Sequence, residues 1–247
     1  RYPGINGIGV IHQVQPSELD AYLARQRVLR PEFNVHPFAE RDIYQPITFI
    51  EPVEINAEAV GLDMMHETNR MTSLAKARDT GIAQITGPIV LVQDEEGTSG
   101  FLFFAPYYLS QEIDTIEDRQ DNFAGAVYAP FIVHKLIEGV LGQDRRNVQI
   151  RLIDGTTVIY DEFSPEHADF DSRPLGTKSI DIDIHGRHWI VDVRAGLNFR
   201  AANPRSESVI ILIVGVVINL ALFFVFFLLT RANRRGLRFS QTATAAL

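Results

Sequence analysis

The feature that most constrains this chain is an uncharged run of 22 residues near its C-terminal end. The run, VIILIVGVVINLALFFVFFLLT, extends from Val209 to Thr230, and Asn219 is its only strongly polar member. As an α-helix it would be about 33 Å long, which is enough to cross the core of a bilayer. A buried core helix is the alternative, but the length of the run argues against it. The sequence therefore predicts one transmembrane helix over residues 209–230.

A cluster of arginines predicts the orientation of that helix. Four arginines lie in the sequence RANRRGLR, directly after Thr230. Because basic flanks stay in the cytoplasm, residues 231–247 are expected to form a cytoplasmic juxtamembrane tail. Residues 1 to about 205 would then lie in the periplasm or outside the cell, anchored to the inner (plasma) membrane. The chain begins RYPGING, without an initiator methionine or a signal peptide, so we expect an upstream membrane signal that is missing here.

Charge and cysteine content exclude several classes of function. Of the 23 basic residues four follow Thr230, which leaves 19 basic and all 31 acidic residues before it, a net charge of −12. An acidic outer domain of this kind argues against a nucleic-acid partner. The chain has no cysteine, so disulfides, thiolate zinc sites and a cysteine nucleophile are excluded.

The first half of the outer part predicts alternating strands and helices. A strand over residues 4–14 is followed by a helix over residues 16–29, with Ser17 as its candidate N-terminal cap. The prolines of YQPITFIEPV keep residues 44–53 extended. Further along, the strands IAQITGPIVLVQ and GFLFFAPYYL flank the acidic sequence DEEGTSG, which predicts a hairpin loop.

A short amphipathic helix is predicted from Thr68 to Gly81. Gly81 stands where a left-handed C-terminal cap belongs. At helical spacing, one face carries the side chains of Met71, Leu74 and Ala75, and the remaining positions carry those of Asn69, Arg70 and Lys76.

A second unit is predicted to start near Asn122. NFAGAVYAPF is a strand candidate and IVHKLIEGVLG a helix candidate. Two hairpins follow, one turning at Asp154-Gly155 and one at His185-Gly186. Each half thus has a strand, a helix and antiparallel strands, which indicates a duplicated α+β unit.

The order and spacing of many residues resemble the CHASE domain, the extracellular sensing module of cyclase- and histidine-kinase-associated receptors. The resemblance covers nearly all of residues 2–200, includes YPGINGIG and AVYAPF…LIEGVLG, and is densest over residues 44–108. In that segment the matching elements are Tyr44, Pro46, Asn56, Gly61-Leu62-Asp63, Glu67, Arg70, Ala77, Thr80-Gly81, Thr86, Leu91, Gln93, Pro106 and Tyr108.

The resemblance implies an architecture. A CHASE domain has a stalk helix, which would lie upstream of Arg1, and two PAS-like α+β subdomains. The membrane-distal subdomain would be residues 2–110 and the membrane-proximal one residues 120–200. The expected fold class is therefore α+β, with two tandem PAS-like subdomains followed by one transmembrane helix. We also expect a homodimer.

Asp63 is the candidate ligand contact. In plant cytokinin receptors, which share the module, an aspartate at this motif position accepts hydrogen bonds from an adenine-type ligand, and a main-chain carbonyl 22 residues later helps; here that position is Ile85. A carboxylate between Leu62, Met64 and Met65 needs donors, and a ligand can supply them. The alternative is an acid at a helix entrance. The acidic loop departs from the plant pattern, so the ligand is not identified as a cytokinin.

Further pocket walls are expected on the distal segments. Aromatic and methionine residues at such spacing are more often plain core, and that alternative stays open. The candidates are Tyr44, Pro46, Phe49, Met64, Ile85, Leu102 and Phe104.

No catalytic constellation, cofactor motif or metal site is predicted. Phosphate-binding loops, nucleophile elbows and Walker motifs are missing from the sequence. His185 and His188 flank a glycine and could suggest a metal pair, but a solvent-exposed turn is favoured over it.

We therefore expect a ligand-sensing domain of a bacterial membrane receptor. A small molecule would bind in the distal subdomain. The proximal subdomain, with Tyr128 and Trp189 in its core, would couple rather than bind. The output would be a histidine kinase or a diguanylate cyclase beyond Leu247. The alternative is a membrane-anchored structural or adhesion module without a ligand. A hydrolase ranks last, because no nucleophile–base pair is evident.

Overall fold

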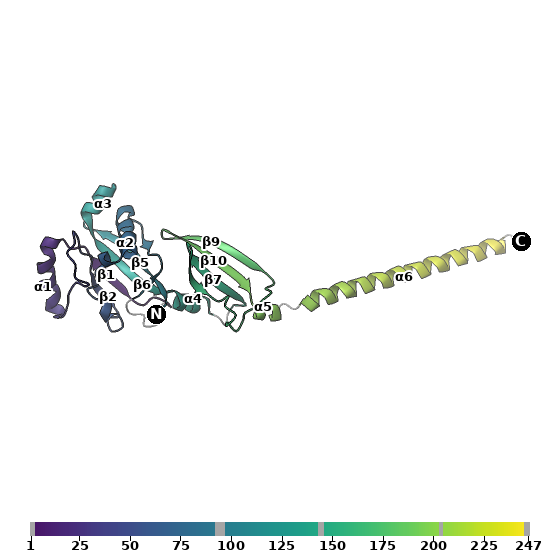
Figure 1. The fold of residues 1–247 in the computed structure, drawn as a ribbon. Coiled ribbons are helices and arrows are strands. Elements are labelled where there is room, and N and C mark those ends of the chain that lie inside the picture. Colours follow the sequence, from purple (N-terminus) through teal and green to yellow (C-terminus); the bar gives the residue numbers. More distant parts are fainter. Residues whose placement is uncertain (1–2, 92–96, 143–145, 203–204, 245–247) are drawn as a thin grey trace. The chain divides into compact units, whose positions relative to one another are not determined.

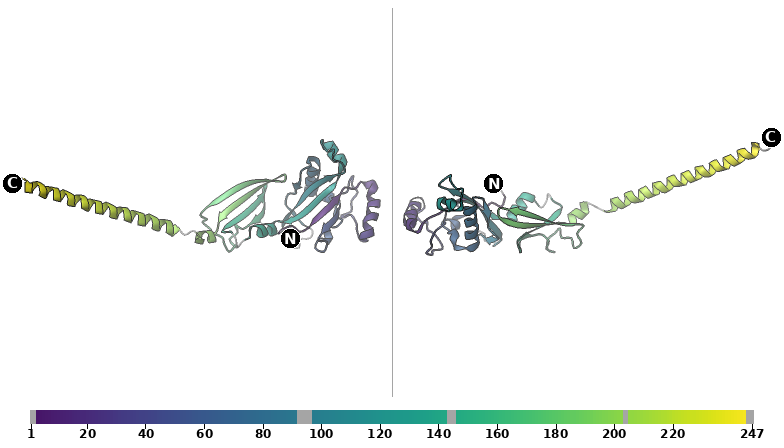
Figure 2. Two further views of the ribbon diagram at one scale, coloured as in Figure 1. Left: turned by 180° about the vertical axis from the view of Figure 1, so that it is seen from behind. Right: turned by 90° about the horizontal axis from the view of Figure 1, so that it is seen from above.

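The computed structural model describes residues 3–91, 97–142, 146–202 and 205–244, and Figure 1 shows its fold. The chain divides into two compact units, Arg1–Phe199 and Arg200–Leu247. The first unit contains two antiparallel sheets with their helices, and Figure 2 shows it from two further sides. The α+β class with antiparallel sheets, followed by one candidate transmembrane helix, is confirmed.

The first sheet is built mainly on two long strands rich in aromatic and β-branched residues, which favour extended backbone. β5 (Ser99–Tyr108) and β6 (Phe123–Ile132) pair along their length, from Gly100 opposite Ile132 to Tyr108 opposite Phe123. The strand order is β2-β1-β6-β5-β3, with β4 also paired to β5. The remaining strands are β1 (Ile8–His12), β2 (Ile47–Glu51), β3 (Gln84–Ile85) and β4 (Ile89–Val90).

β6 lies in the first sheet, although the sequence analysis placed NFAGAVYAPF in the second unit. It pairs with β1 on one side and β5 on the other, so it is a central strand. The partner β1 lies more than a hundred residues earlier in the chain, and a strand pattern does not reveal its partner. Tyr128 on β6 therefore belongs to the core of the first sheet, and the division between the sheets falls after Ile132.

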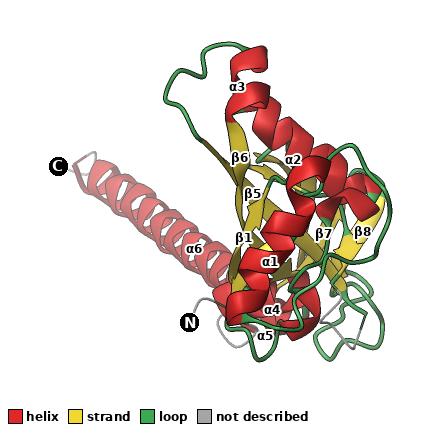
Figure 3. Cartoon of the chain, turned by 90° about the vertical axis from the view of Figure 1, so that its left-hand side faces the viewer, coloured by secondary structure: helices red, strands yellow, loops and turns green. Residues whose placement is uncertain are grey.

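The helix α2 (Thr68–Thr80) packs along β5, as Figure 3 shows. Gly81 ends it as predicted, with φ +70° and its amide donating to Ala77 O at 2.9 Å. Glu67 caps its start by accepting from the amides of Asn69 and Arg70. The other helices of this half are α1 (Leu19–Leu29), preceded by a 3-10 turn and without the predicted Ser17 cap, and α3 (Ile116–Asn122).

The buried face of α2 differs from the predicted one. Arg70, Leu74 and Ala77 are buried, whereas Met71 and Ala75 are only partly covered. These three positions follow the spacing i, i+4, i+7 of a single helical face. Arg70 was expected off the apolar face, and that expectation is wrong, because the buried side of α2 includes it.

The second sheet consists of two hairpins in the order β8-β7-β10-β9. His185-Gly186 turns one hairpin as predicted. In the other, Asp154 pairs with Thr157, so the turn is one residue later than predicted, at Gly155-Thr156. The strands are β7 (Val148–Asp154), β8 (Thr157–Asp161), β9 (Thr177–Ile184) and β10 (Arg187–Ala195), and α5 (Leu197–Ala202) follows.

The two sheets share one hydrophobic cluster. Phe101 of β5 meets Trp189 of β10 edge-on, with ring centroids 5.4 Å apart. The helix α4 (Val133–Leu141) continues β6 without a loop and contributes to the same cluster. Its buried members are Ile85, Phe101, Val133, Leu152, Ile159 and Trp189. Trp189 thus lies between the sheets rather than inside the second one.

The second compact unit contains the helix α6 (Arg205–Thr244). Within it, Val209–Arg231 is long and apolar enough to cross a membrane, and its apolar side chains are exposed. An isolated helix with an apolar surface all round is stable in lipid rather than in water. This segment coincides with the predicted transmembrane helix.

Candidate functional site

The turn before Asp63 depends on a glycine. Gly61 has φ +86°, and a β-carbon there would overlap the carbonyl oxygen of Asn34. Only glycine fits such a close backbone approach. The amide of Asp63 then donates to His36 O at 2.8 Å, and Asp63 pairs with Pro46 in an isolated β-bridge. These contacts fix the direction of the Asp63 side chain.

The Asp63 carboxylate is fully buried and is used within the chain. Its Oδ1 accepts from the amides of Gln45 at 2.8 Å and Met65 at 3.2 Å. Its Oδ2 lies 3.0 Å from Nε of Arg41, whose side chain is 24% exposed. The carboxylate therefore holds two loops and a surface arginine together, and a ligand donor would reach Oδ2 only if Arg41 moved aside.

Two predicted wall residues, Met64 and Leu102, line one small cavity under α2. The cavity has a volume of about 10 Å³, roughly the space of one water. Phe104 is fully buried in the same hydrophobic cluster. The lining is Ile47, Ala59, Leu62, Met64, Arg70, Leu91, Leu102, Tyr128 and Pro130.

The other predicted wall residues lie apart from this cavity. Tyr44 packs with Tyr22 in a separate cluster under α1, and Pro46 is buried beside Asp63. Phe49 is 43% exposed and carries the guanidinium of Arg30 over its ring. Met64, Leu102 and Phe104 thus lie in one hydrophobic cluster, whereas the other predicted wall residues lie outside it.

Ile85 lies where the two sheets meet. Its amide donates to His185 O at 3.0 Å, and its side chain is buried in the shared cluster. Beside it, Lys76 of α2 donates to Gly186 O at 3.4 Å. The tip of the β9–β10 hairpin is therefore attached to both α2 and β3.

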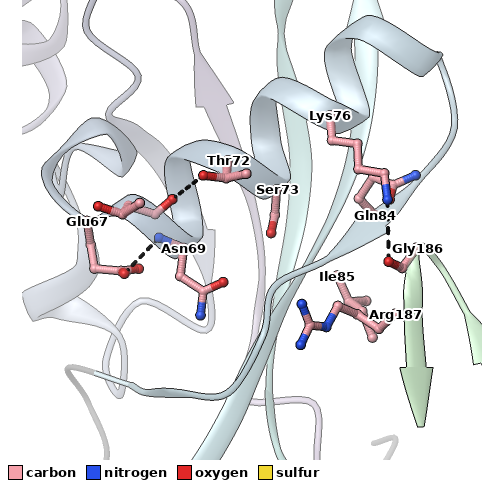
Figure 4. Close-up of a pocket in the computed structure, with 10 residues that line it drawn as sticks. Glu67, Asn69, Thr72, Ser73, Lys76, Gln84, Ile85, Gly186 and Arg187 are labelled. Carbon is pink, nitrogen blue, oxygen red and sulfur yellow. Dashed lines mark hydrogen bonds between the residues drawn. The ribbon is translucent and has the colours of Figure 1, made fainter. Parts of the chain in front are cut away.

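A polar groove runs along this attachment, and Figure 4 shows its side chains. Its volume is about 450 Å³, within the usual range for ligand sites. Much of its polar surface is already paired, since Arg187 binds Asp154 through three contacts and Asn69 bonds to Gly87 and Pro88. It is lined by Glu67, Thr68, Asn69, Thr72, Ser73, Lys76, Gln84, Ile85, Gly186 and Arg187.

Two donors on the small cavity were not predicted from the sequence. Arg70 is 5% exposed, and its Nε has no hydrogen-bond partner among the described residues. Tyr128 is 1% exposed, and its hydroxyl likewise has no partner in the part of the chain that is described. Burial raises the pKa of Tyr128 well above its ordinary value, so the phenol stays a neutral donor. The helical spacing of Arg70 with Leu74 and Ala77 is the signal that could have found it.

A buried ion pair in the second sheet has a structural role. Glu162 accepts from Arg146, from Tyr160 at 2.5 Å and from the amide of Ile150 at 2.8 Å. Burial alone would raise the pKa of Glu162, but these hydrogen bonds outweigh it, and the pKa lies below its ordinary value.

Beside the His185-Gly186 turn, His188 contacts the exposed Asp181 and Asp183. Over the described residues, no group of three or more acidic or histidine side chains is placed to hold a metal.

The chain belongs to the CHASE domain family, because a family model with that description matches residues 1–163 of the 247. The chain is thus a sensing domain of a signalling receptor, with its sensor outside the membrane. It is 26% identical over 149 residues to the Probable histidine kinase 4 of Oryza sativa subsp. japonica, a match covering 60% of this chain and 14% of the relative. It is 23% identical over 190 residues to the Hybrid signal transduction histidine kinase A of Dictyostelium discoideum, a match covering 66% of this chain and 9% of the relative.

Two solved structures have a distant likeness to the chain. An extracellular ligand binding receptor from Desulfohalobium retbaense has a TM-score of 0.41 and 17% identity, covering 61% of this chain and 28% of that one. The periplasmic sensory domain of the Campylobacter jejuni chemoreceptor Tlp1 has a TM-score of 0.42 and 11% identity, covering 77% of this chain and 72% of that one. The chain spans about a seventh or less of the length of the two kinases, so their activity belongs to the proposal below.

Proposed function

We propose that this chain binds a small molecule under α2 in the first-sheet half, and passes the signal to a histidine kinase or diguanylate cyclase in the cytoplasm. The first-sheet half consists of the predicted distal subdomain, residues 2–110, together with β6. The second-sheet half, residues 120–200 with the boundary moved past β6, couples rather than binds. The receptor works as a homodimer in the inner membrane, and its tail, 231–247, is cytoplasmic. The kinase names of the relatives and the arginines after the apolar helix support this proposal.

The observation that carries the proposal is the position of α2. One face of this helix places Arg70 on the small cavity. Its other face lines the groove at the second sheet, where Lys76 contacts the β9–β10 turn. A ligand that moves α2 must therefore move the turn or break its contacts, and packed elements shift as units rather than deforming smoothly. This gives a physical route from the cavity to the second sheet.

We further propose that Asp63 joins the ligand site when it is occupied. Only Arg41 faces its Oδ2 among the described residues, and Arg41 is partly exposed, so the guanidinium can turn into solvent. A ligand N–H or O–H would then take its place, and the buried carboxylate would keep a donor. Tyr44, Pro46, Phe49 and Ile85 would contact only a larger ligand that spreads beyond the small cavity.

The test uses the full chain in lipid nanodiscs. Metabolites are screened by thermal shift, and any binder is followed by hydrogen–deuterium exchange. We expect a binder to slow exchange in Thr68–Thr80 and also at the turn Ile184–Arg187. Protection confined to the outer surface of α1, or no binder in the screen, would contradict the proposal.

A further inference from the structure

Arg70 and Tyr128 both line the small cavity, and neither Nε of Arg70 nor the hydroxyl of Tyr128 has a hydrogen-bond partner in the described part of the chain. We propose that the ligand is an apolar small molecule with one carboxylate, held by Arg70 and Tyr128. This inference rests on the proposed function and adds the chemical class of the ligand.

Arg70 is a buried cation with weak compensation. Its nearest carboxylate oxygen, Glu67 Oε2, is 3.8 Å from Nε, which is too long for a hydrogen bond. Both oxygens of Glu67 already accept from the first amides of α2, at 2.8 and 3.0 Å. The Nη2 atom has one long contact, 3.4 Å to Val90 O. Because a buried charge without a good partner is strongly unfavourable, an anion that enters the cavity gains the full attraction.

Tyr128, on the central strand β6, supplies the second donor. Its hydroxyl is a neutral donor for the reason given above, since its raised pKa prevents ionisation. A guanidinium and a hydroxyl on one cavity match the two oxygens of a carboxylate, and hydrogen bonds to a charged acceptor are the strong ones. A neutral ligand with only donor groups would leave both side chains unpaired.

The rest of the lining determines the body of the ligand. Its seven other side chains are apolar, and none of the described lining residues is acidic. Asp63, which lies between the lining residues Leu62 and Met64 in the sequence, is already paired with Arg41. The present volume is too small for a ligand, so entry requires displacement of a flexible side chain, and Met64 is the one best suited to move. The carboxylate therefore has to be joined to a compact hydrocarbon group.

The experiment compares acids with their own amides. The full chain in nanodiscs is titrated with isovalerate, benzoate, phenylacetate and indole-3-acetate, and with the primary amide of each, by thermal shift and calorimetry. We expect at least one acid to bind and its amide, which has the same shape but no charge, to bind at least 10-fold more weakly. Tyr128→Phe should weaken the acid about 10-fold, and Arg70→Gln about 100-fold or more.

Tyr22→Phe is the matched control, because Tyr22 is also a buried tyrosine but bonds to Thr48 away from the cavity. It should leave the affinity for the acid unchanged. If Arg70→Gln fails to fold, Tyr128→Phe alone decides, since it removes only the hydroxyl. Equal binding of acid and amide, or unchanged affinity in Tyr128→Phe, would overturn the inference.

Two results separate this inference from the proposed function. If no acid binds but a neutral metabolite protects α2 from exchange, the inference fails and the proposed function stands. If neither acids nor neutral compounds bind, both fail.

Discussion

The amide of Ile85 donates a hydrogen bond of 3.0 Å to the carbonyl oxygen of His185, and this bond attaches the edge strand of one sheet to the hairpin tip of the other. The ring of His185 also stands edge-on to Phe103, with centroids 5.1 Å apart. The two halves of the sensor are thus connected by backbone bonding as well as by side-chain packing.

A side chain at Gly186 should disturb the hairpin tip. Gly186 has φ +82°, and a β-carbon would overlap Oε1 of Gln84. Gly155, in the other hairpin, has φ +61° but no described atom within 4 Å of its β-carbon position. We expect Gly155→Ala to lower the free energy of unfolding by about 1 kcal/mol through backbone strain, and Gly186→Ala by roughly 1 kcal/mol more because the attachment is also disturbed. Equal losses in urea titrations of the two variants would show that the contact with Gln84 is not important.

Asp63 should matter for stability before any ligand is added. Asp63→Leu leaves the amides of Gln45 and Met65 without their acceptor and removes the ion-pair partner of Arg41, so we expect a loss of about 3 to 5 kcal/mol. Asp63→Asn keeps one oxygen for the amides and should lose roughly 1 to 3 kcal/mol. Asp20→Asn, on the exposed surface of α1, is the control and should stay within about 0.5 kcal/mol. Chemical denaturation of the three variants measures these differences, and a stable Asp63→Leu protein would contradict the buried network.

Trp189→Ala should destabilise both sheets together. The side chain is buried in the cluster shared by the two sheets, so a cavity there costs about 3 to 5 kcal/mol. Phe38→Ala, at a residue that is 77% exposed, is the control and should change little. Hydrogen exchange in β5 and in β10 should accelerate to the same extent. Faster exchange in β10 alone would mean that the sheets unfold independently.

Acidification should weaken the second sheet through Glu162. The pKa of Glu162 is lower in the folded protein than in the unfolded chain, so its contribution is fully present above the unfolded value of about 4.3. It is lost as the pH falls from there through the folded pKa. We expect the free energy of unfolding to fall over that range in the natural protein and to fall less in Glu162→Gln, which should also be less stable at pH 7. Parallel pH curves for the two proteins would exclude this contribution.

The topology is open to a direct test. A phosphatase that is active only outside the cytoplasm, fused after Ala202, should be active, and the same enzyme fused after Thr244 should be inactive. The reverse pattern would overturn the orientation. A cytoplasmic reporter at the same two positions supplies the complementary control.

Local signals in the sequence predicted local structure well. Gly81 and the pair His185-Gly186 determine their own backbone, because a left-handed conformation is read from the residue itself. The partners of β6 could not be predicted, since pairing depends on distant segments. For the same reason Arg41, far from Asp63 in sequence, was not foreseen as its partner.

The candidate site was predicted only in part. Met64 and Leu102, two of the predicted wall residues, line the small cavity, and their contact with a ligand stays a prediction. Arg70 was expected off the apolar face, although its helical spacing with Leu74 and Ala77 indicates the buried one, where the structure places it. The acidic loop DEEGTSG, predicted to join two strands, lies partly outside the described residues; its Ser99 already belongs to β5 and pairs with Val90.

Because α2 borders the cavity and also touches the β9–β10 turn, ligand affinity and turn geometry belong to one thermodynamic cycle. Linkage is reciprocal: if a bound ligand favours one arrangement of the turn, whatever fixes the turn must change the dissociation constant of the ligand by the same factor. A dissociation constant measured on a truncated first-sheet half would then differ from that of the intact receptor. The affinity of the sensor for its ligand would thus be tuned by substitutions at Lys76 or Gly186, which do not line the small cavity.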